Sequence, residues 1–302
     1  MRLGLAANRR HHQDPRAALF RFLDACAGGL LELDVSLHAV GRTFDAITQH
    51  AAPAALPLLR RYPYGREGGL MKLVAEVVGM GPGRMLDGAI YLIDPVDPSS
   101  IFPEAIALKR QCVIHGKPFI STLASARDWV EMERLHAGLP ADPGADDLHA
   151  FERHTLALIA HDAMKPAMLA FADEHFAQLS RFAERVATGT TGQRLNELAW
   201  SKGWPADQPW ATRHESGPMG GDAQIADRVL EGRCQRVIFF EDPHVARQHE
   251  ADIQLLERAV TTVTGQAVCI TAPPVAARWA SAAAQRARCA SGPLTAADAA
   301  SP

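Results

Sequence analysis

Residues 155–162 read TLALIAHD, and this stretch decides the fold. Its first six residues are small or apolar without a helical period, which predicts a strand buried on both faces. The stretch VIFF at 237–240 predicts a second such strand, and 267–270 a third. Helical patterns lie at 164–181, 223–230 and 251–262. Strands separated by helical crossovers predict an α/β fold, a doubly wound parallel sheet of the Rossmann-like kind with helices on both faces.

The first half of the chain repeats features of the second. The pair Asp94-Pro95 follows the apolar run 89–93, just as Asp242-Pro243 follows 237–240. Further matches are Thr43 with Thr191, Arg110 with Arg258, Gly65, Gly68 and Gly69 with Gly217, Gly220 and Gly221, and the segment 116–122 with 265–271. A duplicated domain explains this repetition better than chance does.

We therefore expect two tandem domains of the same doubly wound fold. The stretch 139–147 is rich in Pro, Gly and Asp and has no strand or helix period, which is typical of a linker or exposed loop. The predicted organisation is a first domain at 1–136, a linker at 137–150, a second domain at 151–290 and a flexible tail at 291–302.

Composition excludes several classes of function. The chain has 302 residues, of which 47% are hydrophobic, and this is enough for two cores. A formal net charge of −3 gives no general attraction for nucleic acid or an anionic membrane, so any anion must be captured locally. The beginning of the chain is too polar for a signal peptide and the apolar runs are too short for a membrane span, so we expect a cytoplasmic protein. Five scattered cysteines without a CxxC spacing predict neither a disulfide framework nor a zinc site.

Four polar clusters lie in the second half; two of them follow predicted strands, and a third ends just before the predicted helix 223–230. They are His161-Asp162 with Lys165, the loop 188–192 (TGTTG), the turn 216–222 (SGPMGGD), and Asp242 with His249 and Asp252. Loops at the carboxyl ends of parallel strands meet in one crevice, where helix N-termini present unpaired N–H groups. Lysine, threonine hydroxyls, carboxylates and histidine in such a place predict a site for a small anionic substrate.

Each cluster also has an ordinary structural explanation. Asp162 and Lys165 suit a capped, solvated helix start, and the loop 188–192 suits either an anion nest or a turn with hydroxyl caps. Asp222 suits a helix N-cap, or a proton acceptor if its carboxylate faces the crevice. A histidine such as His249 near carboxylates suits the polarisation of a carbonyl, although surface histidines without a catalytic role are more common. Local sequence leaves these alternatives open.

In this order, the clusters together resemble the methylglyoxal synthase family, whose members convert dihydroxyacetone phosphate to methylglyoxal and inorganic phosphate. The resemblance covers residues from about 153 to 280. It implies that Asp222 is the catalytic base and that His249 binds the substrate carbonyl and supports the enediolate. Asp242, Asp252 and Asp162 are then the other active-site carboxylates. The residues implied to bind substrate and phosphate are His161, Lys165, Thr188, Thr190, Thr191, Ser216 and Gly217.

The resemblance also implies the partners of the protein. It implies dihydroxyacetone phosphate as the substrate, inorganic phosphate as a product and candidate inhibitor, and no cofactor or metal. Because the family tends to form homohexamers, we expect a homo-oligomer, with a trimer of tandem chains as the specific hypothesis. A rival hypothesis is a non-catalytic phosphate or nucleotide sensor. Asp222 and His249 favour the enzyme, because a sensor needs no base or proton relay.

The first half resembles the same fold without its chemistry. Leu70 aligns with Asp222, and Ile101 aligns with His249. Ala7 and Asn8 align with His161 and Asp162, and His11 aligns with Lys165. Without the base, the histidine and the lysine, residues 1 to about 136 are not expected to catalyse the reaction.

Overall fold

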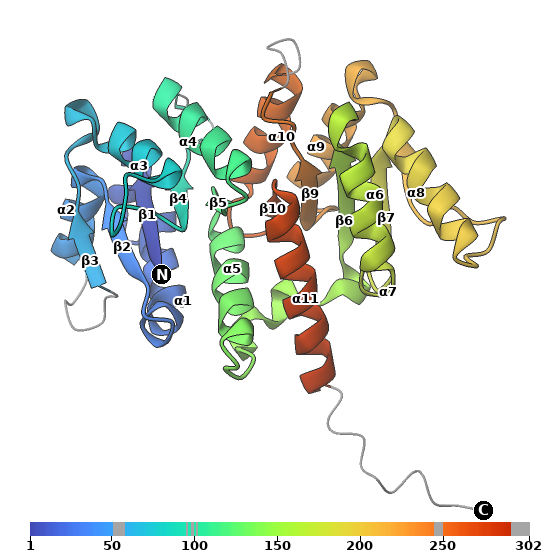
Figure 1. Cartoon of the computed structure of the whole chain (residues 1–302), viewed down its shortest axis with the longest axis horizontal. Coiled ribbons are helices and arrows are strands. Elements are labelled where there is room, and N and C mark those ends of the chain that lie inside the picture. Colours follow the sequence, from blue (N-terminus) through green and yellow to red (C-terminus); the bar gives the residue numbers. More distant parts are fainter. Residues whose placement is uncertain (51–57, 95, 98–99, 101, 245–249, 291–302) are drawn as a thin grey trace, which may run out of the picture.

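Ten parallel strands form two sheets that lie side by side (Figure 1). The computed structural model describes residues 1–50, 58–94, 96–97, 100, 102–244 and 250–290, with the side chains of 250–253 and 290 excepted. The strand orders are β3-β2-β1-β4-β5 in the first sheet and, read from the opposite end, β8-β7-β6-β9-β10 in the second. If the strands of the second sheet are numbered 1 to 5 from β6, both sheets have the order 3-2-1-4-5. The predicted α/β fold with two tandem doubly wound sheets is therefore confirmed.

The strands of the second sheet include all three that the sequence predicts. β6 (Thr155–Ala160) and β9 (Arg236–Phe240) are buried along their whole length, and β10 (Val268–Ile270) pairs with β9. The prediction omitted β7 (Glu184–Thr188), which begins with two charged residues, and β8 (Thr212–His214), a short edge strand. The first sheet consists of β1 (Arg2–Ala7), β2 (Ser36–Ala39), β3 (Leu58–Arg61), β4 (Gly88–Leu92) and β5 (Phe119–Ile120).

Helices cover both faces of each sheet. In the first half, α1 (Ala18–Glu32) packs beside α5 (Leu123–His136), and α3 (Gly69–Val78) packs beside α4 (Pro103–Ile114) in a separate apolar cluster. In the second half, α6 (Lys165–Glu174) contacts α11 (Pro273–Ala290), and α9 (Gly221–Leu230) packs beside α10 (Glu250–Thr262). The helices α2 (Gly41–His50) and α8 (Gly189–Ser201) lie toward the outer ends of the two sheets (Figure 1).

Short helical turns complete the structure. The helical run predicted at 164–181 is broken at His175 into α6 and α7 (Phe176–Leu179). The 3-10 turns are η1 (Arg9–His12), η3 (Gly65–Glu67), η5 (Pro143–Leu148), η6 (Phe151–Arg153), η7 (Asp162–Met164) and η8 (Gly217–Met219). No helix within the described residues is long and apolar enough to cross a membrane.

The two halves share one continuous apolar core. Trp129 and Met132 of α5 belong to the same buried cluster as Trp279 of α11 and the strand residues of both sheets. The helix α5 lies between α1 and α11, and its residues are buried around most of its circumference (Figure 1). The predicted linker contains η5, whose Ala145 and Leu148 are buried. The division of the chain at 136 and 151 stays a prediction, because α5 contacts helices of both halves.

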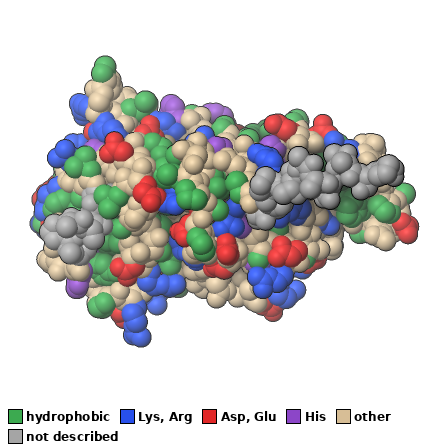
Figure 2. Space-filling model, turned by 90° about the horizontal axis from the view of Figure 1, so that it is seen from below, with side chains coloured by type: hydrophobic (Ala, Val, Ile, Leu, Met, Phe, Trp, Pro, Cys, Tyr) green, Lys and Arg blue, Asp and Glu red, His purple; other side chains and the backbone are tan. Residues whose placement is uncertain are grey.

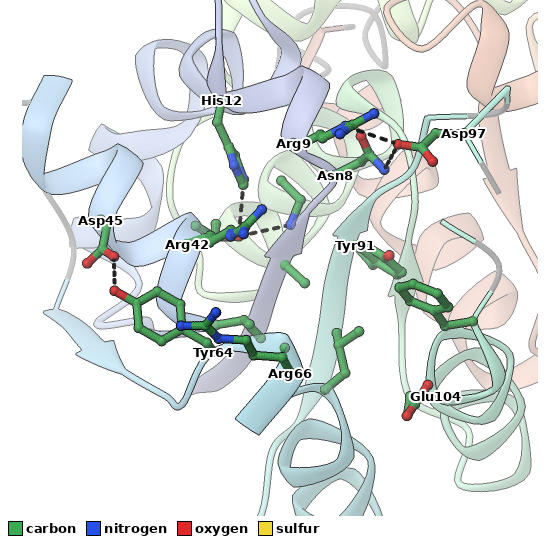
Figure 3. Close-up of a pocket in the computed structure, with 17 residues that line it drawn as sticks. Asn8, Arg9, His12, Arg42, Asp45, Tyr64, Arg66, Tyr91, Asp97 and Glu104 are labelled. Atoms are coloured by element: carbon green, nitrogen blue, oxygen red, sulfur yellow. Dashed lines mark hydrogen bonds and ion pairs between the residues drawn. The ribbon is translucent and has the colours of Figure 1, made fainter. Parts of the chain in front are cut away.

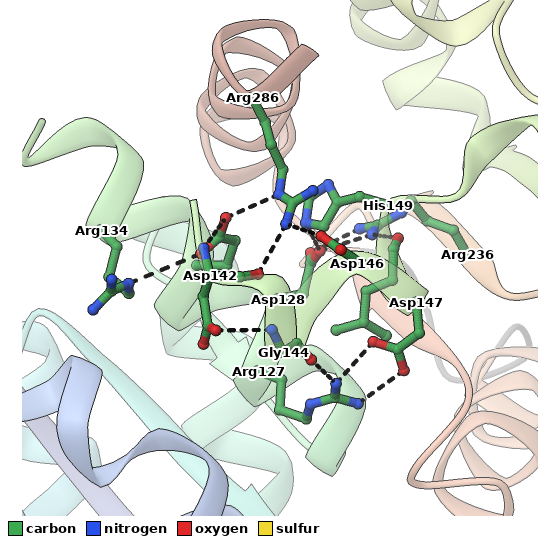
Figure 4. A network of polar contacts seen from close by, with 12 residues as sticks. Arg127, Asp128, Arg134, Asp142, Gly144, Asp146, Asp147, His149, Arg236 and Arg286 are labelled. Carbon is green, nitrogen blue, oxygen red and sulfur yellow. Dashed lines mark hydrogen bonds and ion pairs between the residues drawn. The ribbon is translucent and has the colours of Figure 1, made fainter. Parts of the chain in front are cut away.

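A buried ion pair connects the two halves (Figure 4). Arg236, the first residue of β9, donates two hydrogen bonds to the Asp128 carboxylate of α5, at 2.7 and 2.8 Å. The guanidinium also donates to the Leu148 carbonyl and lies over the Trp279 ring, 4.5 Å from its centroid. Both charged side chains are buried, so each depends on the other for compensation.

Further ion pairs cross the same boundary. Arg278 of α11 donates to both carboxylate oxygens of Glu133 on α5, at 2.7 and 2.6 Å. Lys109 of α4 lies 2.9 Å from a carboxylate oxygen of Glu241, which follows β9, and 3.4 Å from one of Glu257 on α10. The first half therefore supplies both anions and cations to its contact with the second.

We expect the substitution Asp128→Asn to lower the free energy of unfolding by about 3 kcal/mol or more, because it leaves the Arg236 guanidinium buried without a counter-charge. The matched control is Asp147→Asn, since Asp147 pairs with Arg127 at 2.8 Å but is 61% exposed. The control should change the free energy by less than about 1 kcal/mol. Urea denaturation measures both, and equal losses would contradict a special role for the buried pair.

The same ion pair predicts a dependence of stability on pH. Burial alone would raise the pKa of Asp128, but Arg236 outweighs it and holds the pKa well below the ordinary value. A carboxyl with a lowered folded pKa stabilises the protein above its unfolded pKa, about 4, and loses this effect as the pH falls further. The difference in free energy of unfolding between the native chain and Asp128→Asn should therefore shrink below about pH 4. A difference that stays constant in acid would contradict the assignment.

Candidate functional site

Two of the predicted site residues, His161 after β6 and Asp242 after β9, contact each other at the carboxyl ends of these strands. The backbone N–H of Asp242 donates to Nδ1 of His161 at 2.8 Å, and the His161 ring packs edge-on against Phe239. Because Nδ1 accepts this hydrogen bond, the neutral His161 ring carries its proton on Nε2. The Asp242 carboxylate accepts from the backbone N–H of His244 at 2.9 Å, which holds the turn after β9.

Lys165 and Asp162 form an ion pair at the start of α6. The Lys165 Nζ lies 2.5 Å from Oδ1 of Asp162. The lysine side chain is only 14% exposed, whereas that of Asp162 is 96% exposed. Asp162 therefore lies at the solvent-exposed rim of the site, and the buried member of the pair is the cation.

The loop 188–192 connects β7 to α8 and touches the turn after β8. Thr188 precedes the first helical residue, Gly189, whose N–H donates to the Glu215 carbonyl at 3.0 Å. A Cβ on Gly189 would lie 2.8 Å from Cα of Ser216, so only glycine allows the two loops to approach this closely. Thr190 is exposed, whereas Thr188 and Thr191 are buried. The Thr191 hydroxyl is buried and has no hydrogen-bond partner among the described residues, so it is an unsatisfied polar group in this loop.

The turn 216–222 places Asp222 inside the first turn of α9. The N-cap of this helix is Gly220, whose φ of 97° is left-handed, and Asp222 is the second helical residue. The N-cap alternative for Asp222 is therefore wrong. The Asp222 side chain is only 9% exposed, and its Oδ2 would lie 2.8 Å from a Cβ built on Gly217. The carboxylate thus lies over the Gly217 turn, next to the loop that carries Thr188 and Thr190.

Two predicted residues are not placed. His249 lies outside the described residues, and Asp252 belongs to α10 but its side chain is not described. The other predicted residues gather at the carboxyl edge of the second sheet: His161, Asp162 and Lys165 after β6, Thr188, Thr190 and Thr191 at β7, Ser216, Gly217 and Asp222 after β8, and Asp242 after β9. Within the described ranges, no three His, Cys, Asp or Glu side chains form a group that could hold a metal ion.

The first half has the same backbone arrangement, with one correction to the sequence alignment. Asn8 donates its N–H to the carbonyl of Leu92 at the end of β4, as His161 does to that of Phe240 at the end of β9. Asn8 therefore corresponds to His161, and His12 corresponds to Lys165, each one residue later than predicted. The predicted alignment was wrong here because the two segments have no residue in common that could align them. Only the backbone hydrogen bonds show which residues correspond. Leu70 follows Gly69 as Asp222 follows Gly221, as the sequence predicts.

Sequence reasoning missed a pocket in the first half. A cavity of about 920 Å³ lies at the carboxyl edge of the first sheet (Figure 3), and Arg9, Arg42 and Arg66 are among its lining residues. These arginines are far apart in the sequence and belong to no motif. The available signal was Arg42, which interrupts the remnant of the threonine and glycine loop at 41–43.

The fold defines a protein of the doubly wound α/β class, in which small molecules generally bind at the carboxyl ends of the strands. No protein-family profile matches the chain. The chain is 47% identical over 103 residues to the methylglyoxal synthase of Thermus thermophilus, a match that covers 34% of this chain and 75% of that protein. It is 46% identical over 109 residues to the methylglyoxal synthase of Ralstonia nicotianae, which covers 36% of this chain and 73% of that protein.

A similar solved structure carries the same name. The methylglyoxal synthase of Elizabethkingia anophelis NUHP1 is 28% identical, and the match covers 47% of this chain and 80% of that chain with a TM-score of 0.32. The sequence identities and coverage of the curated relatives establish that the chain belongs to the methylglyoxal synthase family. The matches to the Thermus and Ralstonia proteins each span about a third of the chain.

We expect Gly221→Ala to destabilise the protein by about 2 kcal/mol or more, because the new Cβ has no room. It would lie 1.9 Å from the carbonyl oxygen of Glu215, which is backbone and cannot rotate away. The matched control is Gly28→Ala in α1, where a Cβ meets nothing within 4 Å. This control should be neutral or stabilise by up to about 1 kcal/mol. Urea denaturation compares the two, and an unchanged Gly221→Ala protein would show that the turn relaxes.

Proposed function

We propose that the second half of the chain converts dihydroxyacetone phosphate to methylglyoxal and inorganic phosphate. Family membership supports the reaction class, and one observation carries the assignment of the site. Asp222 is a buried carboxylate that lies against the Gly217 turn, next to the loop with the Thr191 hydroxyl. A proton acceptor beside donors for a phosphate is what an elimination of phosphate from this substrate requires.

In the proposed mechanism, Asp222 removes a proton from the hydroxymethyl carbon next to the substrate carbonyl. The C–H electron pair forms the enediolate, whose charge develops on the former carbonyl oxygen. Because Asp222 is shielded from water, it is well suited to act as a base. His161, with its proton on Nε2, is a donor at the same edge of the sheet. The role of His249 as the donor to the carbonyl rests on the family resemblance.

Phosphate departs in the second step. The hydroxyl proton of the enediolate passes to the leaving phosphate, and an aldehyde forms at the former hydroxymethyl carbon. A new carbon–carbon double bond forms to the carbon that carries the phosphate, and the bond between this carbon and the phosphate oxygen breaks. The remaining enolate takes back the proton from Asp222. The released enol then tautomerises to methylglyoxal, so atoms balance without oxidation or reduction. Lys165, the N–H groups at the start of α8 and the Thr191 hydroxyl are the proposed donors to the phosphate oxygens.

We expect Asp222→Asn to lower the rate of methylglyoxal formation by about two orders of magnitude or more, because the amide cannot accept the proton. The matched control is Asp227→Asn on the same helix, since Asp227 is 66% exposed and lies 3.8 Å from Arg233. This control should retain the native rate. Incubation of the purified protein with dihydroxyacetone phosphate, with methylglyoxal and phosphate measured together, tests the proposal.

Equal release of the two products by the native chain is the expected result. A native chain that binds phosphate but releases neither product would support the rival sensor function. Equal rates for the native chain and Asp222→Asn would reject Asp222 as the base.

A further inference from the structure

The pocket in the first half lies at the position that the proposed active site occupies in the second half. It is open at the carboxyl ends of β1, β2 and β4, and its volume is about 920 Å³. Tyr64 and Gly65 hold the positions of Ser216 and Gly217, because Gly41 donates to the Pro63 carbonyl as Gly189 does to that of Glu215. A cavity of this size, with polar groups converging on it, is typical of small-molecule sites.

Compared with the equivalent positions of the second half, this pocket has more arginines and fewer of the proposed active-site carboxylates. Arg42 holds the position of Thr190, Arg66 that of Pro218, and Arg9 that of Asp162. Leu70 holds the position of Asp222. The first half has therefore lost the proposed base and one further carboxylate, and it has gained three guanidinium groups. This exchange suits the binding of an anion without proton transfer.

Two of the arginines are free to bind a ligand. Arg42 and Arg66 have no carboxylate within ion-pair distance among the described residues, whereas Arg9 lies 3.6 Å from Asp97. Both side chains line the pocket, and Figure 3 shows them on the same side of it, with Arg66 beside the ring of Tyr64. Two guanidinium groups on one side of a pocket match the oxygens of a phosphate dianion, which each can bind with two hydrogen bonds.

The carboxylates nearest the arginines are already engaged. Asp45 accepts a hydrogen bond from the Tyr64 hydroxyl at 2.8 Å and pairs with Arg61. Asp97 accepts from the Asn8 amide at 3.1 Å. Glu104 lies on the opposite side of the pocket in Figure 3, away from Arg42 and Arg66. The arginine side of the pocket therefore keeps its positive charge for a ligand.

His12 does not supply this charge. Burial, with neighbouring His11 and Arg42, lowers the pKa of His12 to about 4, so the ring is neutral near neutral pH. Its Nε2 lies 3.4 Å from the Thr43 hydroxyl. The cation that Lys165 provides in the second half is thus provided in the first half by Arg42 and Arg66.

The pocket also has apolar and aromatic lining residues. Leu70, Tyr91 and Phe102 line it together with the end of β1. Burial raises the pKa of Tyr91 to about 12, so its phenol stays neutral. Acidic and basic side chains are mixed over the face seen in Figure 2, which lies at the opposite ends of the strands from the pocket. A ligand that fills the cavity needs a carbon part as well as a phosphate.

We propose that the first half binds an organic phosphate monoester and does not convert it. Its phosphate lies between Arg42 and Arg66, and its carbon part packs against Leu70, Tyr91 and Phe102. This proposal does not depend on turnover in the second half, because it concerns a different pocket and a binding equilibrium.

The test is isothermal titration of the full chain with phenyl phosphate, a monoester that has an aromatic ring and no proton that this reaction could remove. We expect Arg42→Gln/Arg66→Gln to weaken binding at one site per chain about 100-fold, or about ten-fold for each arginine. The matched control is Arg60→Gln, an exposed arginine on β3 that does not line the pocket. The control should bind within about two-fold of the native chain, since no phosphate contact is removed.

Separate variants identify which half is titrated. Lys165→Gln should weaken binding only at the second half. The site that remains in this variant, in the first half, should prefer phenyl phosphate to inorganic phosphate. Binding at this site should be lost when Arg42 and Arg66 are also replaced. If Lys165→Gln abolishes all binding, or if the double arginine variant binds like Arg60→Gln, the proposal is rejected. Arg42→Lys keeps the charge but not the planar fork, so a loss of about three-fold, smaller than the roughly ten-fold loss from removing one arginine, is expected even if the double variant does not fold.

Discussion

The close approach of two backbone segments at a glycine is the constraint on which both halves depend. A Cβ on Gly221 would lie 1.9 Å from the Glu215 carbonyl oxygen, and one on Gly69 would lie 2.1 Å from that of Pro63. Each glycine begins a helix directly after a left-handed glycine, Gly220 or Gly68. The backbone therefore places the residue after this glycine at the carboxyl edge of the sheet, whether its side chain is polar or apolar. In the second half it is Asp222, and in the first half it is Leu70.

This constraint explains why the duplication can be seen in the sequence. The glycines are required by backbone geometry, so they persist where the polar residues around them have changed. The strands β6 and β9 were predictable because strands buried on both faces are mostly apolar, and the charged first residue of β9, Arg236, lies outside the predicted stretch 237–240. The strand β7 was not, because Glu184 and Arg185 at its start find partners that no local pattern reveals: Glu184 pairs with Arg228, and Arg185 donates to the Trp210 carbonyl.

The candidate site was only partly predictable from sequence. The residue types and their order identified the carboxyl edge, but they left two roles for Asp222, of which the helix start at Gly221 excludes the N-cap role. The contact between Asp242 and His161 joins residues from two different strands, so no local pattern contained it. The arginine pocket and the Asp128–Arg236 pair were missed for the same reason. The roles of His249 and Asp252 stay predictions, because the structure does not describe their side chains.

The first half also supports the second through charge. Glu241 precedes Asp242 at the end of β9 and is buried, and this burial raises its pKa above the ordinary value while Lys109 opposes the shift. Lys109 lies on α4, the helix whose first turn carries Glu104 of the arginine pocket. A buried carboxylate this close to the proposed site needs a counter-charge, and Lys109 of the first half provides one at 2.9 Å. The first half therefore has a structural role even without the proposed chemistry. Its Lys109 balances the charge of Glu241, the residue that directly precedes Asp242 at the end of β9.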